Sequence, residues 1–83
     1  MVLFVGRLSK RKGLPVQLSA RNQLHGTVTR INRGAAIANV EIDVAGQRLI
    51  ASITVEAVEE LALSEGSSVT AVIKASDVIV ATD

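Results

Sequence analysis

The chain has 83 residues, with no cysteine, one histidine (His25) and one aromatic residue (Phe4). Without cysteine, disulfides and thiolate metal sites are excluded, and one histidine supplies too few ligands for a structural zinc site. A single aromatic residue argues against proteins that bind nucleic acid by stacking bases on aromatic side chains. It also disfavours large flat ligands such as a flavin. These absences leave few metal, redox or base-stacking functions open.

Long hydrophobic runs are also missing. No stretch approaches the ~20 apolar residues that span a bilayer. The short apolar run Val2–Val5 precedes the basic residues, whereas a secretion signal has its positive charges first. We therefore expect a cytoplasmic protein with no membrane partner.

The composition suggests self-association. One domain is expected at this length, and a domain this small buries only a modest core. Hydrophobic residues nevertheless make up 48% of the chain. Small domains without disulfides or a metal commonly gain stability by oligomerisation. A homo-oligomer is therefore expected.

Charge is distributed unevenly. Residues 1–21 carry five basic residues and no acidic one, whereas residues 22–83 carry four basic and eight acidic residues. We therefore divide the chain into a basic N-terminal extension, residues 1–18, and a domain of residues 19–83. The basic run Arg7–Gly13 is compatible with contact to nucleic acid. A solvated turn is favoured, because the run has neither aromatic residues nor helical periodicity.

Alternating apolar and polar residues predict four strands: one from Leu24, then 38–44, 47–53 and 69–74. A fifth strand is expected at Val78–Val80, and Val2–Val5 is a further short candidate. Between the third and fourth strands, Val55, Val58 and Leu61 recur at helical spacing, with Thr54 as the expected N-cap. This order predicts an all-β fold, a small five-stranded OB-like barrel with one short helix between strands 3 and 4.

Two donor-rich pieces are the main candidates for function. Ser19–Leu24 and Lys74–Ser76 each adjoin a predicted strand and contain no carboxylate. If they converge, they would form a site for a small anion. From residue types alone, however, the favoured explanation is that Arg21 and Lys74 are ordinary surface charges and that Ser19 and Ser76 are turn residues.

Other chemistry-bearing residues have simpler explanations. Glu41 and Asp43 share one face of a predicted strand and could form an acid/base pair or a metal site. A solvated outer face is favoured, because no third ligand joins them. His25 falls on a polar face as an ordinary surface residue. With no cysteine nucleophile, Ser-His-acid set or metal cluster, the chain is not expected to be an enzyme.

Several short motifs together resemble one family. They are Ser19-Ala20-Arg21-Asn22-Gln23-Leu24 with Gly26 and Val28, Ala51-Ser52-Ile53-Thr54, Leu61–Val69 with its central Gly66, and Val72-Ile73-Lys74-Ala75-Ser76-Asp77-Val78. In order and spacing they resemble the molbindin (Mop) or TOBE-domain family of molybdate-binding proteins, over about residues 19–82. The family has an OB-like fold, which agrees with the strand pattern. Its stand-alone members begin almost at the Ser-Ala-Arg motif, whereas eighteen residues precede it here.

The resemblance implies a ligand and a set of residues that bind it. Family members bind molybdate, and tungstate is a possible substitute of nearly the same size and charge. The resemblance places the oxyanion-binding residues at Ser19, Arg21, Asn22, Lys74, Ala75 and Ser76. Stand-alone members form hexamers with the anion between subunits, so the same assembly is expected here.

Three functions remain open at this stage. The first is intracellular storage or homeostasis of molybdate by an oligomer. The second is a molybdate-sensing module derived from a transcription regulator or a transporter ATPase subunit. The third, nucleic-acid binding by an OB barrel, is disfavoured by the missing aromatic residues and the acidic body of the chain.

Overall fold

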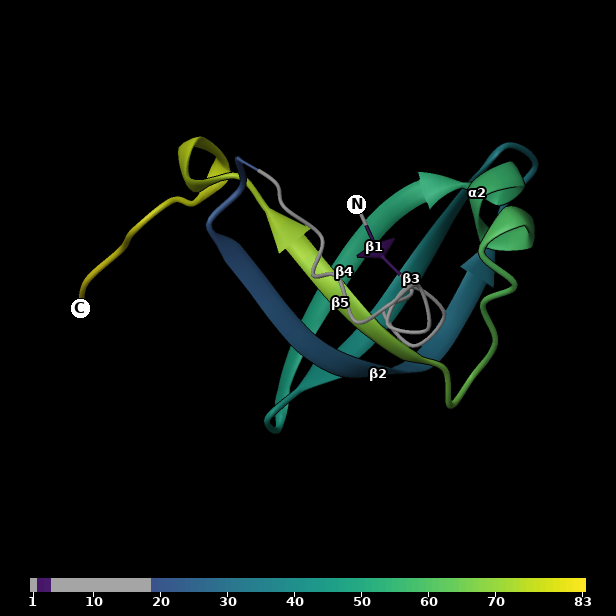
Figure 1. Cartoon of the computed structure of the whole chain (residues 1–83), viewed down its shortest axis with the longest axis horizontal. Helices are drawn as coiled ribbons and strands as arrows, with labels where there is room; N and C mark the ends of the chain where they lie inside the picture. Colours follow the sequence, from purple (N-terminus) through teal and green to yellow (C-terminus); the bar gives the residue numbers. More distant parts are fainter. Residues whose placement is uncertain (1, 4–18) are drawn as a thin grey trace, which may run out of the picture.

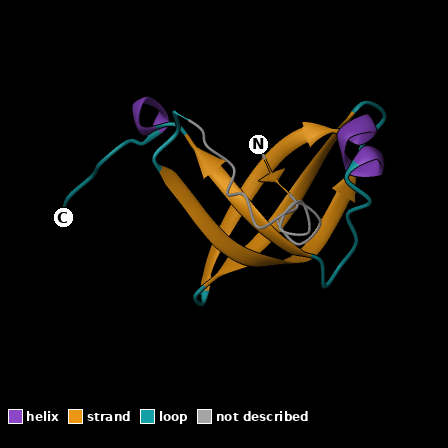
Figure 2. Ribbon diagram, viewed as in Figure 1, coloured by secondary structure: helices purple, strands orange, loops and turns teal. Residues whose placement is uncertain are grey.

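The computed structural model describes residues 2, 3 and 19–83, which form one antiparallel sheet and a short α-helix (Figures 1 and 2). The elements are β1 (Val2–Leu3), β2 (Asn22–Arg33), β3 (Ile37–Val44), β4 (Gln47–Thr54), α2 (Val55–Glu60), β5 (Ser68–Ile73) and the 3₁₀ turn η1 (Ala75–Asp77). The strand order is β1-β5-β2-β3-β4. The predicted basic extension lies outside the described residues, apart from Val2 and Leu3.

Strand β2 is the longest element and connects the two halves of the sheet. Its first half pairs with β5, from Asn22 to Thr27, and its second half pairs with β3, from Thr27 to Arg33. The register with β3 shifts between Val28 and Arg30, as at a β-bulge, which bends a strand and increases its twist. The strand is accordingly strongly curved (Figure 1).

Gly26 lies at this crossing of three strands. A Cβ added there would stand 2.6 Å from the carbonyl oxygen of Asp43 and 2.7 Å from Cγ2 of Ile42. Real Cβ atoms do not approach so closely, so the position requires glycine for reasons of space. The missing side chain lets β2 pass close to β3 and reach both partners.

The β3–β4 hairpin confirms the clearest sequence pattern. Ala38, Val40 and Ile42 are fully buried, as their alternation predicted. A two-residue turn joins the strands, with φ of 51° at Ala45 and 86° at Gly46. Two positive φ values suit the right-handed twist of a tight hairpin.

Helix α2 closes one end of the core. The hydroxyl of Thr54 accepts a hydrogen bond from the Ala57 N–H at 3.0 Å, so the predicted N-cap is confirmed. Val58 is fully buried against β3 and its neighbours. Within the described residues, no helix has the length and apolar character needed to cross a membrane.

The identity of the fifth strand was predicted wrongly. The chain leaves β5 through η1, after which residues 78–83 form no strand, and Ile79 is 93% exposed. The 3₁₀ turn redirects the backbone away from β5, so this apolar run pairs with no described strand. Its place in the sheet is taken by β1, which pairs with β5 through Val2 and Ala71.

The all-β class and the position of the helix are confirmed, with two local differences. Leu24 is 38% exposed although its alternation with Gly26 and Val28 placed it inward, because it lies near the open end of the sheet. The described strands follow a linear order whose ends, β1 and β4, are not paired. The expected closure of the barrel by backbone pairing is therefore not formed by these residues.

Candidate oxyanion site

The two donor-rich pieces lie side by side at one end of the sheet. Asn22 pairs with Ile73 in the first rung of the β2–β5 ladder. Arg21 immediately precedes Asn22 and Lys74 immediately follows Ile73. The two residues therefore lie beside each other, one position beyond this pair, on neighbouring segments of the chain. Residues separated by more than fifty positions in sequence are brought together by this antiparallel register.

The first donor-rich piece, Ser19–Leu24 (the opening motif), is anchored by Ala20 and Gln23. Ala20 is only 7% exposed, whereas its neighbours Ser19 and Arg21 are exposed. The Gln23 side-chain amide approaches the Ala20 carbonyl oxygen at 3.5 Å. The motif is thus held by Ala20 while the hydroxyl and guanidinium on either side face solvent.

The second donor-rich piece, Lys74–Ser76, forms a tight turn together with Asp77 (the late motif). Lys74 has an extended backbone (φ −65°, ψ 140°) and precedes η1, in which the Asp77 N–H donates to the Lys74 carbonyl at 2.9 Å. The amides of Ala75 and Ser76 begin this turn, and the first amides of a helical turn lack intrahelical partners. The turn therefore offers a lysine, a hydroxyl and two backbone donors in three consecutive residues.

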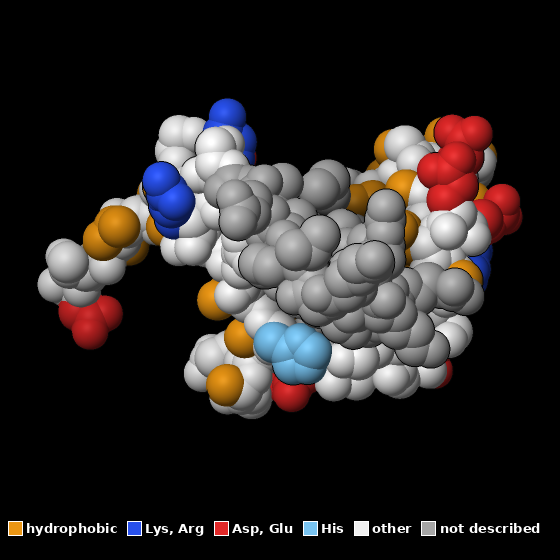
Figure 3. All heavy atoms as spheres, viewed as in Figure 1, with side chains coloured by type: hydrophobic (Ala, Val, Ile, Leu, Met, Phe, Trp, Pro, Cys, Tyr) orange, Lys and Arg blue, Asp and Glu red, His pale blue; other side chains and the backbone are white. Residues whose placement is uncertain are grey.

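The cations at this end, Arg21 and Lys74, have no carboxylate partner in the described part of the chain. Neither Arg21 nor Lys74 forms an ion pair with any residue that the structure describes. Figure 3 shows basic side chains near η1 and a group of acidic side chains over α2 at the opposite end, with a further acidic side chain at the C-terminus. The only acid in the late motif is Asp77, at the end of η1. This separation leaves a region suited to an anion.

All six residues of the predicted site occur at this end of the sheet, but they are not equivalent. Ser19, Arg21, Lys74, Ala75 and Ser76 are exposed. Asn22 is half-buried, and its Nδ2 donates to the Ile73 carbonyl oxygen at 3.2 Å. Its amide group is therefore used within the sheet.

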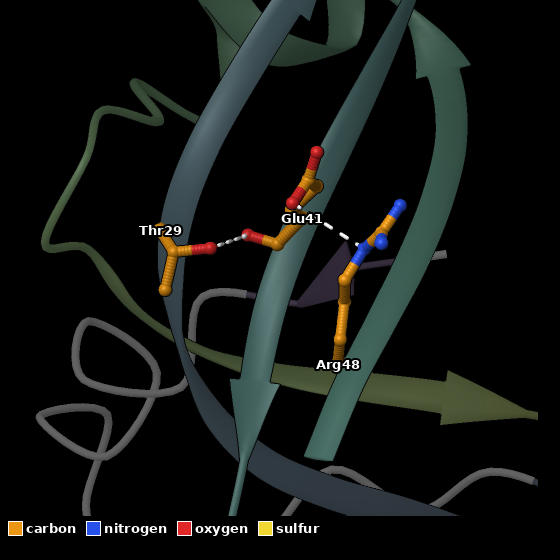
Figure 4. A network of polar contacts seen from close by, with 3 residues as sticks. All are labelled: Thr29, Glu41 and Arg48. Atoms are coloured by element: carbon orange, nitrogen blue, oxygen red, sulfur yellow. Dashed lines mark hydrogen bonds and ion pairs between the residues drawn. The ribbon is translucent and has the colours of Figure 1, made fainter. Parts of the chain in front are cut away.

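The carboxylates of the outer face have a structural explanation. The Arg48 Nε lies 3.4 Å from Oε1 of Glu41 across the β3–β4 ladder, and the Thr29 hydroxyl donates to the Glu41 carbonyl at 3.2 Å (Figure 4). Among the described residues, no group of three potential ligands could hold a metal ion. Glu41 thus belongs to a solvated cross-strand network.

The lone histidine is also accounted for. His25 is exposed, and its Nε2 lies 3.3 Å from the hydroxyl of Ser68 on the neighbouring strand. No carboxylate joins this pair in the described part of the chain. The pair is a surface contact between β2 and β5.

Sequence reasoning missed a groove beside this end of the sheet. A cavity of about 390 Å³ lies between β4 and β5 and reaches η1, with lining residues that include Ala51, Ile53, Val72 and Asp77. Alternation in β4 had marked Leu49, Ala51 and Ile53 as inward. In the structure they are only half-buried. Periodicity identifies an inner face but not whether another element covers it.

The comparisons with known proteins agree with this fold and motif order. The TOBE domain matches residues 18–80. The molybdenum-pterin-binding protein 1 of Clostridium pasteurianum is 44% identical over 66 residues, which cover 78% of this chain and 97% of that protein.

Solved structures give the same result. A molybdate-binding protein from Sporomusa ovata has a TM-score of 0.78 at 37% identity, covering 81% of this chain and all of that one. The cytoplasmic molybdate-binding protein ModG, in a form with molybdate bound, has a TM-score of 0.81 at 41% identity, covering 95% of this chain and 52% of that one. The fold and the two motifs therefore define a TOBE domain. The chain belongs to this family and is similar throughout that domain to stand-alone molybdate-binding members, which confirms the family prediction.

Proposed function

We propose that this chain binds molybdate, or tungstate in its place, for intracellular storage and homeostasis, as a homo-oligomer in the cytoplasm. The observation that carries the proposal is the Asn22–Ile73 pairing, which brings Arg21 and Lys74 to one end of the sheet, where neither forms an ion pair with a carboxylate of the described residues. Similarity to proteins that bind molybdate supports the choice of anion. The cytoplasmic setting is supported by the relative ModG.

The donor set suits a tetrahedral dianion. Molybdate offers only acceptors, so its site should present only donors. Arg21 supplies a planar fork that stays charged, and Lys74 supplies a compact charge with three donors. The hydroxyls of Ser19 and Ser76 and the amides of Ala75 and Ser76 complete the proposed set.

Capture and release, without catalysis, is the proposed activity. The proposed binding residues are donors and cations, and none of them is paired with a general base among the described residues. Binding at such a site changes neither the oxidation state nor the bonding of the anion.

Self-association is supported by apolar surface that the single chain leaves uncovered. Ile37 and Ile50 are about half exposed, and Ile79 and Val80 are 93% and 83% exposed. Ile50 lies on the edge strand β4, and Ile79 and Val80 lie on the C-terminal tail, where exposed apolar side chains favour burial against another copy. A hexamer, the assembly that the family resemblance implies, is the proposed one.

Calorimetric titration of the purified chain with molybdate and then with sulfate tests the proposal, with the mass of the same sample measured by light scattering. We expect tight binding of molybdate, weak binding of the smaller sulfate, and a mass of several subunits. A folded oligomer that binds neither anion would contradict the proposed ligand. A folded monomer that binds molybdate would contradict only the assembly.

A further inference from the structure

Asn22 lies within the proposed site but has a different environment from the other five residues. It is half-buried, whereas the other five are exposed. Its Nδ2 donates to the carbonyl oxygen of Ile73 at 3.2 Å, across the first rung of the β2–β5 ladder. The bond therefore joins the first donor-rich piece to Ile73, the residue immediately before the second piece.

The position of this bond matters for the cations. The ladder ends at the Asn22–Ile73 pair, and strand ends fray most readily because they have neighbours on one side only. Arg21 and Lys74 follow this last pair directly. An additional hydrogen bond at the last rung would keep the ends of β2 and β5 from separating. Arg21 and Lys74 would then stay close enough to bind the same anion.

The direction of the Asn22 side chain also separates it from the cations. Arg21 and Lys74 are exposed, whereas Asn22 is half-buried and its amide nitrogen donates to the carbonyl oxygen of Ile73. Its amide is therefore turned toward the ladder and not toward the exposed donors.

From this geometry we propose that Asn22 is a positioning residue that holds Lys74 and η1 beside Arg21 and does not itself bind the anion. This inference rests on the proposed anion site. It assigns Asn22 a role different from that of the donors around it. Its effect on binding should pass through Lys74.

The first test is independent of any ligand. Amide hydrogen exchange of full-length wild type and Asn22→Ala is compared by mass spectrometry without anion, with Asn39→Ala as the matched control on β3. We expect Asn22→Ala to accelerate exchange several-fold at the η1 amides of Asp77 and Val78, and Asn39→Ala to leave it unchanged. Unchanged exchange in Asn22→Ala would overturn the inference.

The second test is a double-mutant cycle with Lys74→Ala, with molybdate as the probe. Loss of one ordinary hydrogen bond predicts that Asn22→Ala weakens binding roughly three- to tenfold. In the Lys74→Ala background we expect a further loss of less than about twofold, because the positioned group is already gone. The same full loss in both backgrounds would overturn the inference in favour of direct contact.

The two tests separate failure of the inference from failure of the proposed function. If wild type does not bind molybdate but Asn22→Ala still accelerates η1 exchange, the proposed ligand is wrong and the positioning role stands. Thermal unfolding of Asn22→Ala measures its global stability on the same samples. Acceleration spread evenly over all strands would indicate general destabilisation and would contradict a local role.

Discussion

Arg21 and Lys74 carry the only two positive charges within the proposed site, and they come from opposite ends of the domain sequence. Each is exposed and forms no ion pair with a described residue. Neither charge is needed to hold the sheet together. Their removal should therefore affect anion binding more than folding.

We expect Arg21→Ala and Lys74→Ala each to weaken molybdate binding by about ten- to a hundredfold. A hydrogen bond to a charged group contributes roughly 1.5–3 kcal/mol, which corresponds to such factors. Isothermal titration measures the loss, and Arg48→Ala is the matched control because Arg48 pairs with Glu41 on the outer face. Wild-type affinity in both site variants would rule out the assigned residues.

Position 26 requires glycine because a larger side chain would collide with β3, and not because of a role in binding. Gly26→Ala would place a methyl group 2.6 Å from the Asp43 carbonyl oxygen, so β2 or β3 must shift. We expect a loss of roughly 1–3 kcal/mol in the free energy of unfolding, as for other overpacked sites. Urea denaturation at fixed protein concentration measures it. The exposed neighbour Thr27→Ala serves as the control, and equal stability of the two variants would contradict the close approach.

At the level of elements, α2 depends on the N-cap residue that precedes it and on one buried side chain. It has six residues, and so short a helix is marginal by itself. The Thr54 hydroxyl satisfies the Ala57 amide, and Val58 anchors the helix to the core. Capping and packing together therefore supply the stability that propensity does not.

Thr54→Ala should lower the free energy of unfolding by about 1 kcal/mol, the usual cost of losing an N-cap hydroxyl. Thr54→Ser retains the hydroxyl and should recover most of the loss. Urea denaturation of both variants at one protein concentration is the measurement. A serine variant as unstable as the alanine variant would show that the methyl group of Thr54, and not its hydroxyl, matters.

At the level of the whole molecule, the apolar tail and the open edge of the sheet show that one chain does not cover all its hydrophobic surface. The C-terminal tail extends away from the sheet beyond η1 (Figure 1). In this tail, Ile79 and Val80 are 93% and 83% exposed. Burial of such side chains stabilises an assembly roughly in proportion to the area removed from water.

We expect Ile79→Asp to reduce the mass of the assembly, because burial of a carboxylate is costly. Sedimentation analysis of the variant measures this mass. Thr82→Asp adds the same charge to the same tail and should leave the mass unchanged. Equal masses for wild type and Ile79→Asp would exclude the tail from the interface, and a fall in both variants would point to charge repulsion in place of lost apolar burial.

Local periodicity was sufficient for most of the elements. The buried residues Ala38, Val40 and Ile42, the turn at Ala45–Gly46 and the Thr54 cap are all encoded within a few neighbouring positions. The two donor motifs were also visible as sequence, because residue type alone identifies donors and carboxylates. These features are determined by sterics and hydrogen bonding over short stretches of chain.

Long-range pairing decided the rest. Nothing near Val78–Val80 indicates that η1 directs it out of the sheet, or that Val2–Leu3 pairs with β5 in its place. Likewise, only the β2–β5 register shows that Asn22 bonds to Ile73 and that Arg21 and Lys74 are neighbours. Strand propensity depends on neighbouring residues, whereas the choice of partner depends on the packing of the whole sheet, and this packing assembles the proposed site.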